Sequence, residues 1–342
     1  MIDSALIDFN SKNFMAGFLG GCCERCAYIS LSHNGNAHLR SLGLRLGRVQ
    51  SLSESSQEVW VAGEALIDLL PGAGQSIPVV GGGPANTAKA LAHLRVRTSF
   101  IGGISDDSYG DLIESELLSY GVDLKLARKS NLPTATAEVK LDEKGSATYK
   151  FRLEQTATFD YGDWLPIGKP KVLYTGTLAT LIEPGAGALY KWVEGMEVPI
   201  VYDPNIRSSV LNDKAKYLES FSKWAEISKV VKLSLEDLEW LGLSAPAILE
   251  MGPELVVLTR GDQGISAFTK DESLHQPSEK VEVVDTVGAG DTVGAVIVEG
   301  MLKDFDLRSG NLEEILKRAV RAAGITCSRA GAKPPTLKEL NS

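Results

Sequence analysis

Cysteine is scarce in this chain of 342 residues, and its spacing is unlike that of a disulfide-stabilised protein. Three of the four cysteines, Cys22, Cys23 and Cys26, lie within five residues of one another, and only Cys327 falls elsewhere. A disulfide framework distributes paired cysteines over a small fold, which these positions do not do. We therefore expect a reducing, cytoplasmic environment.

Long apolar runs and an excess of positive charge are also missing. No stretch reaches the roughly 18 consecutive apolar residues of a membrane helix, because Gly, Asp or Lys interrupts the longest candidates. A formal net charge of −9 opposes a broad contact with nucleic acid or a membrane surface. Nucleic acids and membranes are therefore not expected partners.

Histidine is limited to four residues, which leaves little material for catalysis by a Ser-His or Cys-His pair. Cys23-x-x-Cys26 followed by His33 and His38 offers the ligand types of a zinc site. Its spacing is poor, however, and no strand or helix pattern surrounds it. The motif G-x-x-x-x-G-K-[ST] is absent, which excludes phosphoryl transfer by a P-loop.

Residues 1–57 differ from the rest of the chain, because they show no sustained helical or strand period. We predict a poorly ordered N-terminal extension there and one domain over 58–338. In that domain apolar runs alternate with amphipathic segments, which indicates an α/β fold whose mostly parallel sheet is covered on both faces. The expected strands are 58–70, 97–104, 171–176, 198–205, 227–234, 254–261, 264–268 and 281–285. The expected helices are 85–94, 111–121, 185–193, 214–224, a short one from 235, 291–302 and 312–328.

Residues 134–153 interrupt this rhythm. Apolar and polar residues alternate there around the turn Asp142-Glu143-Lys144-Gly145, the pattern of a hairpin with one solvated face. We expect a small β-sheet beside the main one.

The strongest chemical signal is the segment Asp285-Thr-Val-Gly-Ala-Gly-Asp-Thr292, between an apolar run and a predicted helix. Small residues at Gly288, Ala289 and Gly290 let backbone N–H groups approach an anion, and the helix start adds its dipole. Asp291 then stands where a carboxylate can accept the proton of an attacking hydroxyl.

Two alternative interpretations of this segment exist. In the first, Asp291 merely caps a helix after a tight turn. In the second, the glycines begin a dinucleotide-binding G-x-G-x-x-G, but the third glycine, Gly294, comes one place late and no full βαβ half follows.

A second glycine-rich motif, Gly81-Gly-Gly-Pro-Ala-Asn86-Thr87, precedes another predicted helix. Its glycines allow a small polar ligand to approach the backbone, and Asn86 offers both donors and an acceptor to hydroxyl groups. A flexible loop before a helix is the alternative.

Together these motifs resemble the ribokinase-like, or PfkB, family of carbohydrate kinases, and within it the fructokinases. The resemblance runs from about Val59 to Thr336 through the ordered segments GEALIDLLP, GGGPANTAKAL, the hairpin, YDPNIR, KLSLEDLEWL, VVLTRGDQGI, DTVGAGDT and CSRAGAKPP. It implies a three-layer α/β/α sandwich in which the hairpin is a small β lid. An ordered set of short patterns is far more specific than any one of them, because chance matches to all of them in register are improbable.

The resemblance also implies roles for individual residues. Asp291 matches the catalytic base, and Gly288, Ala289 and Gly290 match the anion hole. Residues implied to bind the sugar are Asp68, Gly82, Gly83, Asn86 and Arg152 of the lid. Residues implied to lie at the nucleotide are Arg207 of a cluster with Asp203 and Asn205, together with Ser234, Asp237, Thr259, Gly261 and Gly264.

Two positions depart from the family pattern. Ser234 and Asp237 stand where the family often carries Asn and Glu, so the acid that organises water around Mg²⁺ is one methylene shorter. Gly83 replaces a lysine found in many ribokinases, a change that fructokinase-like sequences tolerate.

The expected activity is transfer of the γ-phosphoryl group of ATP to a sugar hydroxyl, with fructose as the first choice. The resemblance implies Mg²⁺ near Asp237, a monovalent cation such as K⁺ near Asp285, and a homodimer through the lid. Alternatives that stay open are another sugar, a sugar acid or a nucleoside as acceptor, and a catalytically impaired protein that binds sugar and nucleotide for regulation.

Overall fold

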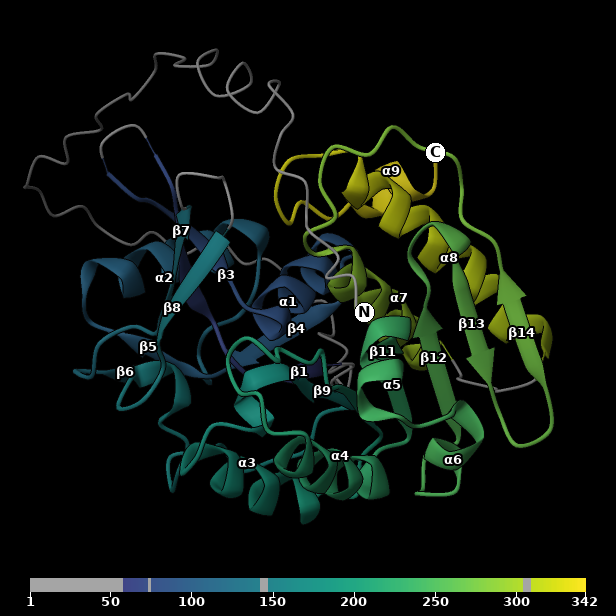
Figure 1. Cartoon of the computed structure of the whole chain (residues 1–342), viewed down its shortest axis with the longest axis horizontal. Coiled ribbons are helices and arrows are strands. Elements are labelled where there is room, and N and C mark those ends of the chain that lie inside the picture. The colour runs from purple at the N-terminus through teal and green to yellow at the C-terminus, as the bar shows by residue number, and fades with distance from the viewer. Residues whose placement is uncertain (1–57, 73–74, 142–146, 304–308) are drawn as a thin grey trace, which may run out of the picture. The chain divides into compact units, whose positions relative to one another are not determined.

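The computed structural model describes residues 58–72, 75–141, 147–303 and 309–342 (Figure 1). The N-terminal extension predicted over 1–57 and the zinc alternative within it lie outside the described residues, as does the tip of the predicted hairpin.

A sheet of eight strands forms the centre of the described chain. Its order is β14–β13–β12–β11–β10–β9–β1–β4. All pairs from β12 to β4 are parallel, and β13 and β14 join antiparallel at the opposite edge. The strand bounds are β1 Glu58–Ala62, β4 Arg97–Ile101, β9 Val172–Gly176, β10 Ile200–Asp203, β11 Val230–Ser234, β12 Leu255–Thr259, β13 Ile265–Phe268 and β14 Ser273–Gln276.

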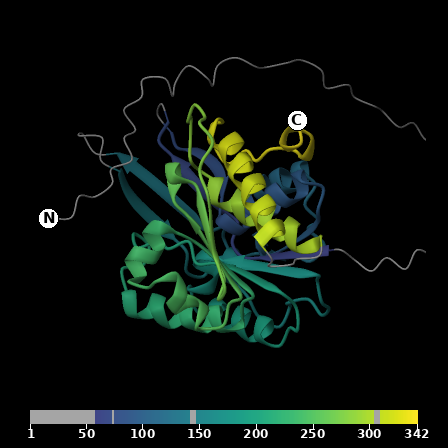
Figure 2. The ribbon, with the colours of Figure 1, turned by 90° about the vertical axis from the view of Figure 1, so that its right-hand side faces the viewer.

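Helices cover both faces of this sheet because alternate strand residues are apolar on opposite sides. Along β1, Val59 and Val61 belong to one hydrophobic core, while Trp60 and Ala62 belong to the other. Figure 2 shows the two helical layers on either side of the strands. The first core is covered by α1 Gly83–His93, α2 Ser108–Tyr120, α7 Ala289–Leu302 and α8 Ser309–Cys327. The second is covered by α3 Gly185–Glu194, α4 Lys214–Ile227, α5 Leu235–Leu241 and α6 Ala245–Leu249.

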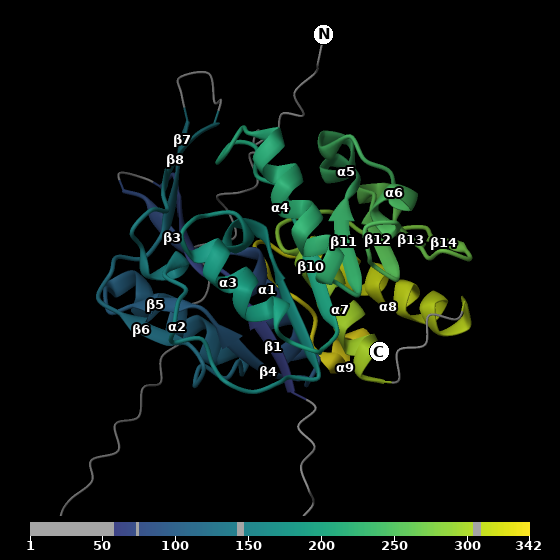
Figure 3. The ribbon, with the colours of Figure 1, turned by 90° about the horizontal axis from the view of Figure 1, so that it is seen from below.

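A separate four-stranded sheet has the order β3–β2–β7–β8. Its strands are β2 Leu66–Leu70, β3 Ile77–Gly81, β7 Thr136–Leu141 and β8 Ala147–Arg152. The last two are antiparallel and confirm the predicted hairpin. Figures 1 and 3 show this sheet on the side of the main sheet that holds β1 and β4, away from β13 and β14.

Short elements complete the described chain. They are the parallel strands β5 Gly103–Ser105 and β6 Arg128–Ser130, the 3-10 turns η1 Ala157–Phe159, η2 Thr177–Thr180 and η3 Gly261–Gln263, and the C-terminal helix α9 Leu337–Leu340. The three-layer α/β/α class with a small additional sheet is thus as the sequence predicted.

The single strand predicted over 58–70 is wrong, because the chain leaves the main sheet at Gly63. The strand splits into β1 and β2, which belong to different sheets. A Cβ atom on Gly63 would lie 2.2 Å from Cγ of Pro84 at the start of α1. Glycine therefore lets the chain pass close to that helix as it changes sheets.

The strand predicted over 281–285 is also wrong. The valines that suggested it are exposed, Val283 to 61%. The N–H groups of Val284 and Asp285 both donate to the carbonyl oxygen of Cys327, at 2.8 and 3.1 Å. The segment is hydrogen-bonded to the end of α8 instead of pairing with a strand. β-Branched residues favour a strand, but whether they form one depends on tertiary contacts that composition does not show.

None of the helices in the described part of the chain combines the length and the hydropathy that a membrane span requires.

Candidate active site

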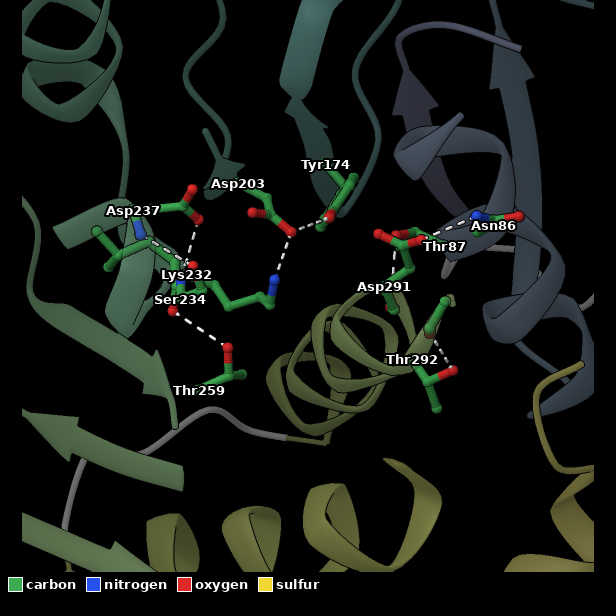
Figure 4. A network of polar contacts seen from close by, with 12 residues as sticks. Asn86, Thr87, Tyr174, Asp203, Lys232, Ser234, Asp237, Thr259, Asp291 and Thr292 are labelled. Atoms are coloured by element: carbon green, nitrogen blue, oxygen red, sulfur yellow. Dashed lines mark hydrogen bonds and ion pairs between the residues drawn. The ribbon is translucent and has the colours of Figure 1, made fainter. Parts of the chain in front are cut away.

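The site is built around Asp291 in the first turn of α7. Its side chain is buried, with 7% of the residue exposed, and its Oδ2 accepts a hydrogen bond from Nδ2 of Asn86 at 2.9 Å. The neighbouring Thr87 hydroxyl donates to the Asp291 carbonyl oxygen at 3.4 Å. Figure 4 shows α1 presenting Asn86 and Thr87 to this turn. Two segments 205 residues apart in sequence therefore meet at one carboxylate.

The start of α7 is arranged to receive an anion. Gly288 is the N-cap residue, with φ of 77°, and no side chain caps the helix. A Cβ atom there would lie 2.7 Å from Cβ of Ala332, so the turn requires glycine both for its conformation and for space. Within the described ranges, the N–H groups of Gly290 and Asp291 have no hydrogen-bond acceptor. These donors and the helix dipole favour negative charge.

The N-cap assignment bears on the alternative that Asp291 is only a helix cap. Because Gly288 holds the capping position and the Asp291 carboxylate turns to Asn86, the side chain does not cap α7.

The environment of Asp291 raises the pKa of its carboxyl from 3.8 to about 6. Burial is the main cause, and the nearby Asp203 carboxylate adds to it. The Lys232 ammonium, the Asn86 hydrogen bond and the Arg207 guanidinium oppose the increase. A carboxylate with such a pKa is a stronger base than an exposed aspartate.

A buried polar network lies beside this turn, on the neighbouring strands β9, β10 and β11. Oδ2 of Asp203 accepts hydrogen bonds from the Lys232 ammonium at 2.6 Å and from the Tyr174 hydroxyl at 2.9 Å (Figure 4). All three side chains are almost completely buried. A Cβ atom on Gly290 would lie 3.3 Å from Nζ of Lys232, so the ammonium borders the first turn of α7.

Sequence reasoning placed Asp203 in a cluster at a strand end but missed Tyr174 and Lys232. The available signal was a charged residue, Lys232, inside the otherwise apolar strand Val-Val-Lys-Leu-Ser. Lysine is almost never fully buried unless it is paired, so a lysine in a central strand calls for a buried acid next to it.

The residues predicted to bind sugar come from β2, from the glycine-rich motif at the start of α1, and from β8. Asp68 is on β2, and burial raises the pKa of its carboxyl from 3.8 to about 6 against the opposing charge of Arg207. A Cβ atom on Gly81 would lie 2.2 Å from Oδ2 of Asp68. The first glycine of the motif thus leaves space for this carboxylate.

The next two glycines bring the backbone to the Asp291 carboxylate. Gly82 has φ of 106°, a conformation that favours glycine. A Cβ atom on Gly83 would lie 2.8 Å from Cγ2 of Thr177, 3.2 Å from Oδ1 of Asp291 and 3.3 Å from Nδ2 of Asn205. A lysine at position 83 would need these groups to move. This lack of space explains why the chain has glycine where many ribokinases have lysine.

Ser234 and Asp237 form the capping box of α5. Ser234 is the N-cap residue, its hydroxyl accepts from Asp237 N at 3.0 Å, and Oδ2 of Asp237 accepts from Ser234 N at 3.0 Å. Oδ1 of Asp237 accepts from Ile206 N at 2.9 Å, which ties α5 to the segment after β10. Burial raises the pKa of the Asp237 carboxyl, against these hydrogen bonds.

The remaining nucleotide candidates lie at the adjacent strand β12. Thr259 ends this strand, and its hydroxyl donates to Leu233 O at 3.5 Å. Gly261 and Gly264 have φ of 55° and 95° in the turn to β13, and a Cβ atom on Gly264 would lie 2.1 Å from Gln276 O. These glycines permit the turn beside the carboxyl ends of β11 and β12.

Three further candidates are exposed or only partly buried: Arg152, Arg207 and Asp285. Arg152 ends β8 and is exposed, and the Arg207 side chain is exposed as well, although its charge acts on Asp68 and Asp291. Asp285 accepts hydrogen bonds from Val287 N at 3.0 Å and Gly331 N at 2.8 Å. It thereby joins the segment before α7 to the turn after α8.

The carboxylate oxygens at these places are the hard donors that Mg²⁺ and K⁺ prefer. Each Asp237 oxygen accepts one backbone N–H and keeps further acceptor capacity, so its chemistry fits contact with Mg²⁺ through water. Among the described residues, no group of three or more His, Cys, Asp or Glu side chains is close enough to hold a metal ion by itself.

Comparison with known proteins identifies the class to which this fold and site belong. The model of the pfkB family carbohydrate kinases matches residues 75–339. The chain therefore belongs to the PfkB family and is an ATP-dependent carbohydrate kinase.

Its curated relatives include fructokinases. The fructokinase of Rhizobium leguminosarum bv. trifolii is 37% identical over 276 residues, which cover 76% of this chain and 84% of that protein. The fructokinase of Escherichia coli is 28% identical over 317 residues, 84% of this chain and 99% of that protein.

Solved structures share the fold. The fructokinase of Vibrio cholerae O395, with fructose, ADP and calcium ion bound, has a TM-score of 0.75 at 24% identity and covers 83% of this chain and 97% of that one. The aminoimidazole riboside kinase of Salmonella enterica, with aminoimidazole riboside and an ATP analog, has a TM-score of 0.73 at 22% identity over 83% and 98%. The same fold therefore serves kinases with different acceptors.

Proposed function

We propose that this kinase phosphorylates fructose. The observation that carries the proposal is the Asp291 carboxylate, held by Asn86 beside the uncapped first turn of α7. The similarity to fructokinases, 37% in the Rhizobium protein, favours fructose among the acceptors.

In the proposed reaction Asp291 accepts the proton of a sugar hydroxyl. The hydroxyl oxygen forms a bond to the γ-phosphorus of ATP while the bond from that phosphorus to the bridging oxygen breaks, and ADP leaves. The free N–H groups at Gly290 and Asp291 stabilise the charge on the transferred group.

The other site residues are assigned by their places around this turn. Asp68, Gly82, Gly83 and Asn86 form the sugar side. Ser234, Asp237, Thr259, Gly261 and Gly264 form the nucleotide side, with Arg207 as a positive charge near the phosphates. Asp237 is the residue that would hold Mg²⁺ through water, and the bound ion would supply charge that neutralises the phosphates.

Further proposals follow from the family resemblance alone. They are that Arg152 on the hairpin reaches the sugar when the hairpin closes as a lid, that a monovalent cation such as K⁺ binds near Asp285, and that the chain dimerises through its hairpins. The boundary of the extension near residue 57 and the cytoplasmic location also stay predictions.

A panel of acceptors tests the function. Purified protein is supplied with ATP, Mg²⁺, K⁺ and either fructose, glucose, ribose, a sugar acid or a nucleoside, and ADP formation is measured. We expect the highest kcat/KM with fructose and a phosphorylated sugar in the product. A higher kcat/KM with another acceptor would assign the enzyme to that acceptor, and no ADP formation with any of them would support the impaired, regulatory alternative.

A further inference from the structure

Glu64 is a buried acid that sequence reasoning assigned no role. It lies in the short connection from β1 to β2, only 2% exposed. Its Oε1 accepts a hydrogen bond from the Thr177 hydroxyl, and its Oε2 accepts one from the N–H group of Ala179 at 3.1 Å. One carboxylate thus joins the start of the small sheet to the turn η2, 113 residues further along the chain.

Thr177, the first partner of Glu64, has an unusual backbone conformation. Its φ of 54° lies in the left-handed region. This region is unfavourable for β-branched residues, and such residues persist there only where the surrounding structure holds them. The two hydrogen bonds to Glu64, at the Thr177 hydroxyl and at the Ala179 N–H, provide that restraint at two residues of the turn η2.

The Thr177 methyl group lies where the sugar side of the site meets the proposed base. A Cβ atom added to Gly83 would be 2.8 Å from this methyl group and 3.2 Å from Oδ1 of Asp291. Thr177, Gly83 and the Asp291 carboxylate therefore border the same small space, and a rotation of the Thr177 backbone would change its shape.

Among the described residues, the charged and titratable groups that interact with the Glu64 carboxyl include the Arg207 guanidinium and the hydroxyls of Tyr161 and Tyr217. Burial raises the pKa of Glu64 from 4.5 to about 7, against the backbone N–H groups and Arg207. The fold therefore keeps a costly buried acid at this point, which demands a compensating role.

We propose that Glu64 is a positioning residue that holds Thr177 in its left-handed conformation and thereby sets the shape of the sugar-acceptor site beside Asp291. The proposal rests on the proposed function, because it assumes that the acceptor binds between Gly83 and Asp291. It predicts that changes at Glu64 act on acceptor binding through Thr177 and leave nucleotide binding almost unchanged.

The first test is a double-mutant cycle of Glu64→Gln and Thr177→Gly, with Glu299→Gln as the control. Above pH 7, where Glu64 is mostly charged, Glu64→Gln replaces the carboxylate by a neutral amide whose NH₂ can only donate, so the Thr177 hydroxyl must reverse its role and accept. The charge-assisted hydrogen bonds are lost, and KM for the acceptor rises about tenfold or more, while KM for ATP changes less than about twofold. Glycine adopts positive φ without strain, so in the Thr177→Gly background the same change at Glu64 has an effect of less than about threefold. Equal effects in both backgrounds, or equal effects on both KM values, would overturn the proposal.

Glu299 makes the control informative because it is also a buried glutamate with ion pairs, to Arg318 and Lys303, and it lies near the C-terminal end of α7, about two turns away from Asp291. Glu299→Gln lowers the thermal midpoint and leaves KM for the acceptor unchanged. If it raises that KM as Glu64→Gln does, general destabilisation explains both variants and the proposal is wrong.

A second pair of variants approaches the contact from its partner, in case Glu64→Gln does not fold. Thr177→Ser keeps the hydroxyl that donates to Glu64, whereas Thr177→Val keeps the shape without it. We expect a rise of less than about threefold in acceptor KM for Ser and about tenfold or more for Val. A larger effect of Ser than of Val would show that the methyl group alone matters.

The acceptor used is whichever sugar of the panel has the highest kcat/KM, so a wrong choice of fructose does not affect the result. If no sugar is turned over, the shift of the thermal midpoint on adding each sugar replaces KM, since a ligand stabilises the folded state that binds it. Failure of the proposed function and failure of the role of Glu64 are thus distinguished.

Discussion

At the scale of single residues, the site depends on carboxyl groups that the fold keeps from water. Asp291 has one hydrogen bond from Asn86, an adjacent acid in Asp203 and a cation in Lys232. Burial outweighs the favourable contacts and raises the pKa of Asp291 to about 6. The pKa of the base is therefore close to the pH at which the enzyme works, as general-base catalysis favours.

The pH dependence of the rate follows from this pKa. The deprotonated form of Asp291 is the active one, so kcat/KM should rise with pH and level off above about pH 6. Asp68 titrates in the same pH range, so a variant is needed to show which of the two carboxyl groups causes the rise of kcat/KM with pH. Asn86→Ala removes a hydrogen bond that lowers the pKa of Asp291, so the rise of kcat/KM should move to higher pH in this variant. If the rise stays at the same pH, a group other than Asp291 causes it.

Replacing the base gives a direct measure of its contribution. Asp291→Asn keeps the size of the side chain and removes its ability to accept a proton. Loss of general-base assistance should lower kcat by about 10² to 10⁴, with little change in sugar or ATP affinity. Steady-state kinetics with calorimetric binding separates the two. A variant with more than about a tenth of the wild-type kcat would contradict the assignment.

At the scale of elements, close approach of backbone segments shapes the site more than side-chain size does. The glycines at the junction of β3 and α1 bring the backbone against Asp68, Thr177 and Asp291, and Gly288 turns the chain into α7. The starts of α1 and α7, which also contact each other through Thr87, therefore form one unit around the base.

Gly83→Ala tests this close approach. The new Cβ would lie 2.8 Å from Cγ2 of Thr177 and 3.2 Å from Oδ1 of Asp291, so the base or the turn must shift. A misplacement of about 1 Å costs up to about 10²-fold in rate, and we expect kcat/KM to fall by about tenfold to a hundredfold. Gly162→Ala is the matched control, because its Cβ meets nothing within 4 Å, and it should retain full activity. Equal activity of the two variants would show that the site has room for the methyl group.

At the scale of the whole molecule, the functional acids should make stability depend on pH. The pKa values of Glu64, Asp68 and Asp291 are about 7, 6 and 6 in the folded chain, against ordinary values of 4.5 and 3.8. Between these values the folded state binds more protons than the unfolded state. Their contribution to stability is thus complete below the ordinary pKa values and is lost as the pH rises through 6 and 7.

Thermal unfolding at pH 5 and pH 8, at constant ionic strength, checks this expectation. The thermal midpoint should be lower at pH 8, and the difference should shrink in Glu64→Gln and Asp291→Asn, which have no carboxyl to charge. The low pKa of Glu339, about 2, affects only more acidic solutions and does not interfere. A midpoint that rises from pH 5 to pH 8 would show that burial of these acids is not the dominant effect on stability.

The sequence by itself determined the fold class, the hairpin and the two glycine-rich turns. Alternating apolar runs and helical periods are local patterns that can be found in the sequence alone. The segments around Gly83 and Gly290 are glycine-rich and stand directly before a helical period, which indicates a tight turn into a helix. The same local reasoning failed at Gly63, where one apolar run enters two sheets, and at Val283, whose β-branched run is tied to α8.

Only the tertiary structure decided which side chains act together. Lys232 and Asp203 lie 29 residues apart and on neighbouring strands, and Glu64 reaches Thr177 across 113 residues. A sequence shows that a polar residue stands in an apolar run, but its partner depends on strand order and on the distance between segments. The pKa of Asp291 has the same origin, because burial and neighbouring charges exist only once the chain has folded.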